Sequence, residues 1–152
     1  MAKKPKTLRQ KLFKKFRNPF KKIDENYENI KYIENPSEEL QMAAVRTDGS
    51  NIRFIQNPTE KVKLYILSIS CVDIKWIRDQ SEKIQLAALE NAAKTPSYIK
   101  YLIWDMKKPT IAVQKRAIYL SNYDLDVIRA CPNWRDFVEE IENEMIIKDI
   151  IE

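Results

Sequence analysis

The sequence predicts an all-α protein: a right-handed α-solenoid of four to five short helix-pair repeats with a basic N-terminal arm and a C-terminal capping helix. Three observations predict this class. The chain has 152 residues, enough to bury one core, and glycine occurs only once, at Gly49. Hairpins, nucleotide-binding loops and nucleophile elbows use glycine for positive φ or close backbone approach, so folds built on them are disfavoured. The third observation is a repeat of about 22 residues.

Residues 1–22 are predicted to form a basic amphipathic arm. They contain ten Lys or Arg and no acid, a charge of +10, whereas residues 23–152 carry −5. Its candidate contact residues are Lys11, Lys14, Lys15 and Arg17, which surround an apolar stripe in residues 8–20. Four roles stay open for the arm. It neutralises nucleic-acid phosphates, docks on a partner or on the chain's own solenoid, lies on an anionic membrane surface, or is a solubilising tail.

The repeat organises residues 23–152 into one predicted helical-repeat domain. Residues 30–45 recur at residues 52–67 with an offset of 22 and no gap, and a third copy starts at Ile74. The fourth copy starts at Ile99 after three extra residues and takes four more before Pro109, and a degenerate fifth opens at Leu125. A single helix pair cannot bury its apolar face alone, whereas stacked neighbours form one continuous core.

Each repeat is predicted to hold a short helix followed by a longer one. The short helix has aliphatic residues at i and i+3, and the longer one has an apolar stripe of helical period. Between them we expect Asn35 as the N-cap, Pro36 at the first helical position and Glu38 reaching back to the cap. Asn57 and Asp79 are the predicted caps of the next two longer helices.

Two helix ends have signals of their own. Gly49, after Asp48, is a predicted C-cap of the first longer helix. In the last segment, residues 133–152, one side is apolar and the opposite side carries glutamates. This pattern fits a terminal cap with a polar outer face. Its apolar residues are Trp134, Phe137, Val138, Ile141 and Met145, and its exposed glutamates are Glu139, Glu140, Glu142 and Glu144.

The repeat unit resembles the short HEAT-like and leucine-rich-repeat-variant helical repeats, with their Asn-Pro-Ser-x-x-x-Gln-x-x-Ala-Val character. It is most similar to the Asn-Pro-Ser-Glu-Glu-x-Gln-x-Ala-Ala-Val repeats of uncharacterised phage and bacterial proteins. The resemblance covers roughly residues 28–130 and is clearest in residues 35–45. It implies a fold, an interaction role and a phage or mobile-element origin, and it transfers no catalytic residue.

Composition also limits the chemistry that we expect. Without histidine there are no His-based acid–base groups, triads or usual zinc sites, and no glycine-rich phosphate loop is present. Cys71 and Cys131 are expected to be buried, reduced thiols of a cytoplasmic protein. We therefore expect no enzyme, cofactor, metal site or small-molecule substrate. One enzymatic alternative stays open, a HEAT-like protein that holds DNA lesions without using a short motif.

Two recurring surface patterns supply the candidate partner-binding residues of the repeats. In the short helices a cation precedes a ring four times, which suits single-stranded nucleic acid or an acidic peptide unless the rings simply pack between repeats. These pairs are Lys31-Tyr32, Arg53-Phe54, Lys75-Trp76 and Lys100-Tyr101. In the longer helices one polar position is expected to line a concave binding groove or to be ordinary solvated surface. Its members are Gln41, Lys63, Gln85 and Gln114.

These patterns predict a non-enzymatic interaction module that binds a macromolecular partner. The resemblance points to a phage or mobile-element protein that binds and inhibits a host or defence protein, with the longer helices as the contact surface. The alternative is a nucleic-acid-binding protein that uses the basic arm and the basic–aromatic pairs.

Overall fold

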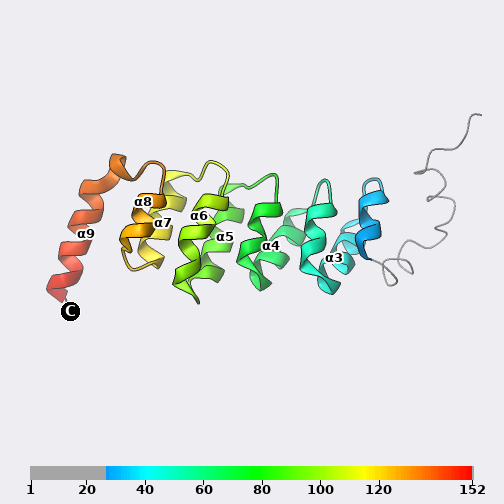
Figure 1. The fold of residues 1–152 in the computed structure, drawn as a ribbon, viewed down its shortest axis with the longest axis horizontal. Coiled ribbons are helices and arrows are strands. Elements are labelled where there is room, and N and C mark those ends of the chain that lie inside the picture. The colour runs from blue at the N-terminus through cyan, green and yellow to red at the C-terminus, as the bar shows by residue number, and fades with distance from the viewer. Residues whose placement is uncertain (1–26, 152) are drawn as a thin grey trace, which may run out of the picture. The chain divides into compact units, whose positions relative to one another are not determined.

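A computed structural model describes residues 27–151 of the chain, and the side chains of residues 29–146. Every regular element in this range is an α-helix or a 3-10 helix, which confirms the all-α class (Figure 1). The predicted basic arm, residues 1–22, lies outside the described residues. The chain divides into two compact units, residues 1–66 and residues 67–152, and the division falls within one helix, α4.

Unit 1, residues 1–66, alternates short 3-10 helices with longer α-helices. Its described elements are η1 (Tyr27–Tyr32), α3 (Glu38–Thr47), η2 (Gly49–Phe54) and most of α4 (Glu60–Ile69). The elements η1, α3 and η2 contact one another. Their aliphatic side chains form the core of the unit, which contains Ile30, Leu40, Ala44, Val45, Ile52, Ile55, Val62 and Ile66.

Unit 2, residues 67–152, continues the alternation with modifications near its C-terminal end. Its elements are η3 (Cys71–Trp76), α5 (Glu82–Ala92), η4 (Pro96–Tyr98), α6 (Ile99–Asp105), α7 (Ile111–Leu120), α8 (Leu125–Ala130), η5 (Trp134–Phe137) and α9 (Val138–Ile151). The shorter elements contact in succession, η3 with α6 and α6 with α8, and the longer helix α5 contacts α7. The elements η3 to α8 of unit 2 therefore form two rows, one of shorter and one of longer helices.

The aliphatic residues of the short helices anchor both cores. Ile52 and Ile55 of unit 1, and Ile74 and Ile77 of unit 2, are all buried. Side chains three residues apart eclipse one another in a 3-10 helix, so both members of each pair lie on the same side. The predicted i, i+3 spacing is confirmed at these positions.

The longer helices begin two residues later than predicted. In α3 the N-cap is Ser37, whose hydroxyl accepts a hydrogen bond from the Leu40 N–H, and Glu38 is the first helical residue. The predicted cap Asn35 has a φ of 49°, in the left-handed region, which asparagine tolerates better than most residues. The cap prediction was wrong because Asn35 turns the chain while the serine after Pro36 supplies the capping oxygen.

The same shift applies to the other longer helices. Thr59 caps α4 by accepting from Val62 N–H, and Thr110 caps α7 by accepting from Val113 N–H. In α5 the N-cap is Ser81 rather than the predicted Asp79. The repeat therefore places a hydroxyl residue at each N-cap.

The helix end predicted at Asp48-Gly49 is confirmed, since α3 ends at Thr47 and Asp48 is its C-cap. Gly49 has no positive φ, however, and begins η2, whose N-cap Asp48 accepts the Ser50 N–H at 2.9 Å. A left-handed cap occurs instead at the end of α7, where Asn122 and Tyr123 have φ of 57° and 60°. The N–H of Asn122 bonds to Tyr119 O and that of Tyr123 to Ile118 O, which is a Schellman motif without glycine.

The last helix has the side-chain distribution that its sequence predicts. Phe137 and Ile141 are buried, and Trp134, Val138 and Met145 are half-buried. The glutamates of the opposite side, Glu139, Glu140, Glu142 and Glu144, are exposed. This segment thus packs through one face and presents an acidic face to solvent.

Candidate interaction surface

The four polar residues predicted to line a concave groove are buried. Gln41, Lys63, Gln85 and Gln114 lie on α3, α4, α5 and α7 and are between 0% and 8% exposed. A buried amide is costly unless it is hydrogen-bonded, and each of the three glutamines bonds to backbone groups. Their placement on a partner-binding surface is therefore wrong, because the pattern marks an internal position of the repeat.

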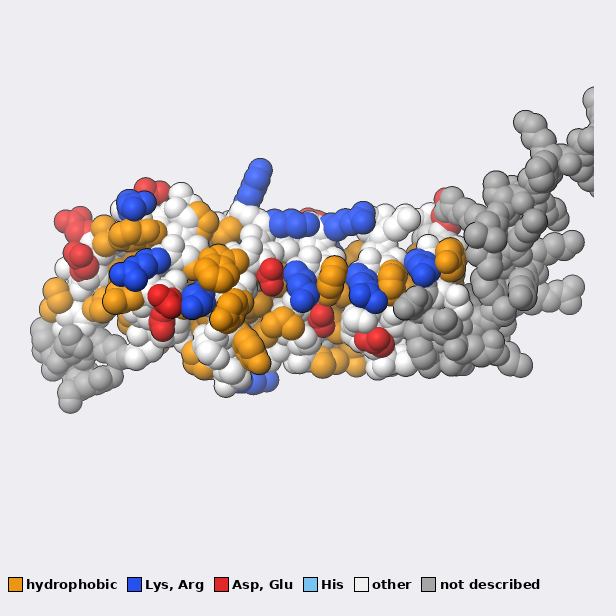
Figure 2. All heavy atoms as spheres, viewed as in Figure 1, with side chains coloured by type: hydrophobic (Ala, Val, Ile, Leu, Met, Phe, Trp, Pro, Cys, Tyr) orange, Lys and Arg blue, Asp and Glu red, His pale blue; other side chains and the backbone are white. Residues whose placement is uncertain are grey.

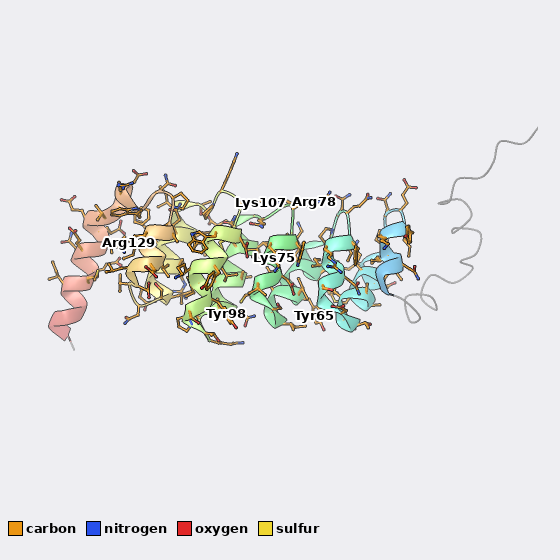
Figure 3. All side chains as sticks on the ribbon, in the orientation of Figure 1. Tyr65, Lys75, Arg78, Tyr98, Lys107 and Arg129 are labelled. Atoms are coloured by element: carbon orange, nitrogen blue, oxygen red, sulfur yellow. The ribbon has the colours of Figure 1, made fainter. Side chains whose placement is uncertain are left out.

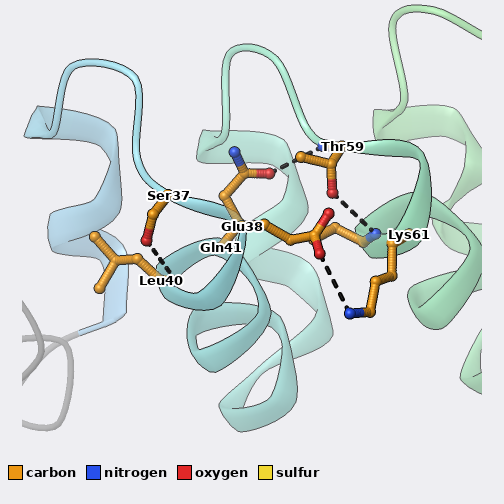
Figure 4. A network of polar contacts seen from close by, with 7 residues as sticks. Ser37, Glu38, Leu40, Gln41, Thr59 and Lys61 are labelled. Atoms are coloured by element: carbon orange, nitrogen blue, oxygen red, sulfur yellow. Dashed lines mark hydrogen bonds and ion pairs between the residues drawn. The ribbon is translucent and has the colours of Figure 1, made fainter.

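In unit 1 the Gln41 side chain links the start of α3 to the loop before α4 (Figure 4). Its Nε2 donates to Pro36 O at 2.9 Å and to Asn57 O at 3.5 Å. Its Oε1 accepts the Thr59 N–H at 3.0 Å. We call this arrangement, in which one buried glutamine joins two loops, a glutamine clamp.

In unit 2 Gln114 forms a second glutamine clamp. Its Nε2 donates to Pro109 O at 2.9 Å and to Asn133 Oδ1 at 3.1 Å, and its Oε1 accepts the Asn133 N–H at 2.8 Å. The clamp joins the start of α7 to the segment before η5. Gln114 itself is fully buried, whereas Pro109 is half-buried and Asn133 is exposed.

Gln85 occupies the same repeat position but forms no complete glutamine clamp. Its Nε2 donates to Lys107 O at 2.9 Å, but its Oε1 has no hydrogen-bond partner among the described residues. In the Gln41 clamp the loop carbonyl and the loop N–H lie two residues apart. The residue two positions after Lys107 is Pro109, which has no N–H. Gln80 supports the same loop, since its Oε1 accepts the Lys107 N–H at 2.7 Å.

Several charged side chains on the longer helices form ion pairs within their unit. In unit 2 the Arg116 guanidinium donates two hydrogen bonds to Glu90, at 2.6 and 3.0 Å, and these bonds lower the pKa of Glu90. The ion pairs of this kind are Glu38–Lys61, Glu90–Arg116 and Lys115–Glu140. Exposed pairs of this kind stabilise a protein only weakly, because water screens them. These charged groups already have partners inside the molecule, so binding another molecule through them would have to break or share an ion pair.

The short helices of unit 1 carry an alternating row of cations and rings. Lys31 Nζ lies 5.1 Å from the Tyr32 ring centroid and 5.2 Å from that of Phe54. The Arg53 guanidinium lies 4.5 Å from the Phe54 centroid. Both cations are exposed, Tyr32 is 38% exposed and Phe54 is half-buried. Figure 2 shows basic and hydrophobic side chains next to one another on this face.

The short helices of unit 2 carry further cation–ring contacts and an aromatic cluster formed by Tyr101 and Trp104. Lys75 lies 5.4 Å from the Trp76 ring, and Lys100 lies 5.5 Å from Tyr101 and 6.0 Å from Trp104. The Tyr101 and Trp104 rings meet edge to face at 5.7 Å. Trp76, Tyr101 and Trp104 are 40%, 52% and 63% exposed, and the elements η3 and α6 that carry them are in contact. Figure 3 labels Lys75 on this face.

Trp104 is the member of this cluster that the sequence prediction missed. It lies outside the fourfold cation–ring pattern, in the part of α6 that follows the pattern. The spacing of three from Tyr101 and four from Lys100 places all three on one side of a helix, which is the signal that reveals it.

Lys100 forms an ion pair across two helices. Its Nζ lies 3.0 Å from Asp126 Oδ2, which joins α6 to α8. The hydrogen bond with Asp126 raises the pKa of Lys100 and lowers that of Asp126. The ion pair thus holds the Lys100 side chain in place beside the Tyr101 and Trp104 rings.

Two open depressions of about 490 and 480 Å³ lie in unit 2, and the exposed ring of Tyr98, which Figure 3 labels, lines both. The first also contains the Lys100–Asp126 pair and Asp124, whose carboxylate caps α8. The second is lined by apolar residues such as Ile69 and by polar ones such as Asn91 and Lys94. The acids of the first depression are therefore engaged in structural roles.

The described residues contain no group of three His, Cys, Asp or Glu residues that could hold a metal ion. Cys71 and Cys131 are free and buried, and burial raises the pKa of both thiols, that of Cys131 to about 12. Such thiols are protonated near neutral pH and are poor nucleophiles. No helix in the described part of the chain is long and apolar enough to cross a membrane.

The predicted partner-binding residues therefore fall into three groups. The basic and aromatic residues of the short helices lie at or near the surface and contact one another within each unit. The polar residues of the longer helices are internal. The arm residues Lys11, Lys14, Lys15 and Arg17 lie outside the described part of the chain.

Comparison with known proteins adds no family to this description. No protein-family model, no curated protein and no solved structure matches the chain significantly.

Proposed function

We propose that the repeats stack into a right-handed α-solenoid, and that the protein is a non-enzymatic module that binds a protein partner. The sequence repeat of about 22 residues supports the solenoid. So do the two rows of helices within unit 2, because solenoids are built by stacking like elements on like. Two free, buried cysteines fit a cytoplasmic location, where thiols stay reduced.

We assign the contact surface to the short helices. The observation that carries this assignment is the exposed pair of rings, Tyr101 and Trp104, that meet on α6 of unit 2. Soluble proteins rarely expose several large rings together, and Trp and Tyr are enriched among the residues that dominate binding energy. The longer helices are a weaker choice, because their central polar position is buried and several of their charges are paired.

Nucleic acid is the second candidate partner, favoured by the +10 charge of residues 1–22 and by the cations beside the rings. Binding to nucleic acid would weaken steeply as the salt concentration rises, because phosphate contacts release counterions. Deleting residues 2–22 would weaken such binding strongly. Binding that persists at moderate salt and after nuclease treatment favours the protein partner.

A pull-down from a nuclease-treated bacterial lysate tests the proposal, since the resemblance implies a host or defence protein as the target. The variant Tyr101→Ala/Trp104→Ala removes two exposed rings of the cluster. The control Ile111→Ala/Tyr119→Ala removes two exposed apolar side chains of α7, which are 49% and 59% exposed.

We expect the wild type and the control to retain one stoichiometric protein that the cluster variant loses. Equal retention by both variants would remove the cluster from the binding surface. A lysate that yields no stoichiometric protein would contradict the proposed function.

A further inference from the structure

We propose that residues 107–110, between α6 and α7 of unit 2, form a hinge, because Pro109 lacks the N–H that would complete a glutamine clamp at Gln85. We call these four residues the hinge loop. Such a hinge is a property of unit 2 alone. It does not depend on any partner, so it goes beyond the proposed function.

The Gln85 amide is the internal anchor of the hinge loop, and only one side of this amide is paired. Gln85 is 2% exposed, and its Nε2 donates to Lys107 O at 2.9 Å. Its Oε1 has no hydrogen-bond partner among the described residues. A buried acceptor that stays unpaired costs its desolvation without any return. The closed loop is therefore anchored less firmly here than a complete clamp would anchor it.

The clamp of unit 1 shows which group is missing. There Gln41 donates to Asn57 O and accepts the N–H of Thr59, two residues later. In the hinge loop the bonded carbonyl belongs to Lys107, and two residues later stands Pro109, whose ring nitrogen carries no hydrogen. The proline thus removes the donor that the spacing of a clamp requires.

The backbone of the hinge loop is strained at the residue between these two. Lys108 has a φ of 51°, in the left-handed region that is unfavourable for a residue with a Cβ atom. Lysine also lacks the short polar side chain with which asparagine can stabilise this conformation by a local hydrogen bond. Opening of the loop relieves the strain, so the strain favours the open state.

Side-chain bonds at the surface also join the hinge loop to the preceding repeat. Gln80 Oε1 accepts the Lys107 N–H at 2.7 Å, and Lys107 Nζ donates to Arg78 O at 3.2 Å. Figure 3 labels Lys107 and Arg78 on this edge of the molecule. Thr110 Oγ1 donates to Glu82 Oε2 at 2.6 Å. All of these bonds are exposed, so water can replace them, and segments held in this way open at a low free-energy cost.

The hinge lies next to the exposed ring pair of α6. This helix ends at Asp105, two residues before the hinge loop, and it carries Tyr101 and Trp104. It also contacts α7, which begins directly after the loop. Opening of the loop therefore allows α6 and its rings to move relative to α7.

Hydrogen–deuterium exchange of the full chain, followed by mass spectrometry, tests the hinge. The variant Pro109→Ala restores an N–H to the loop, and Pro109→Ala/Gln85→Leu restores the N–H but removes its acceptor. Gln85→Leu alone completes the cycle. The control Pro132→Ala makes the same change directly before Asn133, whose N–H already bonds to Gln114. A urea unfolding curve for each variant separates local opening from a change in global stability.

In the wild type we expect residues 107–114 to be less protected from exchange than residues 131–138, after correction for intrinsic rates. Pro109→Ala should slow exchange of residues 107–114 about fivefold, the effect of one added hydrogen bond. In the Gln85→Leu background the same substitution should have no such effect, and Pro132→Ala should leave exchange of residues 131–138 no slower than in the wild type.

Equal exchange of residues 107–114 in the wild type and in Pro109→Ala would overturn the hinge. So would an equal slowing with and without Gln85, since the restored N–H would then act through another group. Protection of residues 107–114 in the wild type that matches that of residues 131–138 would overturn it as well.

Discussion

Gln114 shows how a single buried side chain positions the loops of neighbouring repeats. A fully buried amide has two donors and an acceptor to satisfy, and here a loop carbonyl, an asparagine side chain and a loop N–H provide the partners. An aliphatic residue at this position would fill the space equally well but would leave those loop groups unpaired. The glutamine therefore fixes how one loop lies against the next.

Replacing Gln114 by leucine should lower the free energy of unfolding by about 1–3 kcal/mol, because Pro109 O and the Asn133 N–H lose their partners. The control Gln56→Leu changes an exposed glutamine and should stay within about 0.5 kcal/mol of the wild type. Urea unfolding followed by circular dichroism measures both. Equal effects of the two substitutions would contradict a stabilising role for the clamp.

Lys108 has a φ of 51°, a left-handed conformation that costs most residues about 1–2 kcal/mol. Lys108→Gly should therefore raise the free energy of unfolding by about 0.5–1 kcal/mol, the relief of strain being partly offset by the greater entropy of glycine in the unfolded chain. Asn57 also precedes a proline but does not have positive φ, so Asn57→Gly should lower stability. Thermal unfolding compares them, and a loss of stability in Lys108→Gly would argue against the strain.

Cys131 makes stability depend on pH in the alkaline range. Burial raises the pKa of its thiol to about 12, whereas an unfolded thiol titrates near about 8.5. Above that pH the unfolded chain releases a proton that the folded chain keeps, so stability falls as pH rises towards 12. Urea unfolding between about pH 7 and about pH 10 should show this decline, and a shallower one in Cys131→Ala. A slope unchanged by the substitution would exclude the thiol as its cause.

At the scale of helices, the N-caps of α3 and α5 offer a matched pair. Ser37 accepts the Leu40 N–H at 3.3 Å, whereas Ser81, at the same repeat position, makes no side-chain capping bond. Ser37→Ala should cost about 1 kcal/mol of unfolding free energy and Ser81→Ala only a few tenths. Thermal or urea unfolding separates these values. A larger loss in Ser81→Ala would contradict the capping assignment.

The alternation of helices could be predicted because its signal is local. The aliphatic residues Ile30, Ile52 and Ile74 recur with one period, and periodic apolar residues report directly on buried faces. The start of α3 was misplaced by two residues because Asn35 and Ser37 both have the chemistry of an N-cap. The positive φ of Asn35 shows that this residue forms the turn and that Ser37 is the cap. A sequence pattern does not contain backbone angles.

The site was harder to predict because burial of a polar residue depends on groups far away in sequence. Gln41 is internal because a carbonyl and an N–H of the loop 16 and 18 residues later accept and supply its hydrogen bonds. The cations of the short helices were identified by their recurrence alone. Trp104 lies outside that recurrence. It was identified only once the structure showed that residues 99–105 form one helix with Trp104 exposed on it.

At the scale of the whole molecule, the proposed solenoid would give the two rows of helices different tasks. The glutamine clamps and ion pairs of the longer helices would hold neighbouring repeats together. The rings and cations of the short helices would face the partner. The binding surface would then be the short-helix row, in contrast to the longer-helix groove that the sequence predicted.

Hydrogen–deuterium exchange of the full chain, free and bound to the protein recovered from the nuclease-treated lysate, tests this division most directly. Binding through the short helices should slow exchange in η1, η2, η3 and α6, and leave α5 and α7 nearly unchanged. Protection confined to α5 and α7, with the short helices exchanging as in the free protein, would contradict it.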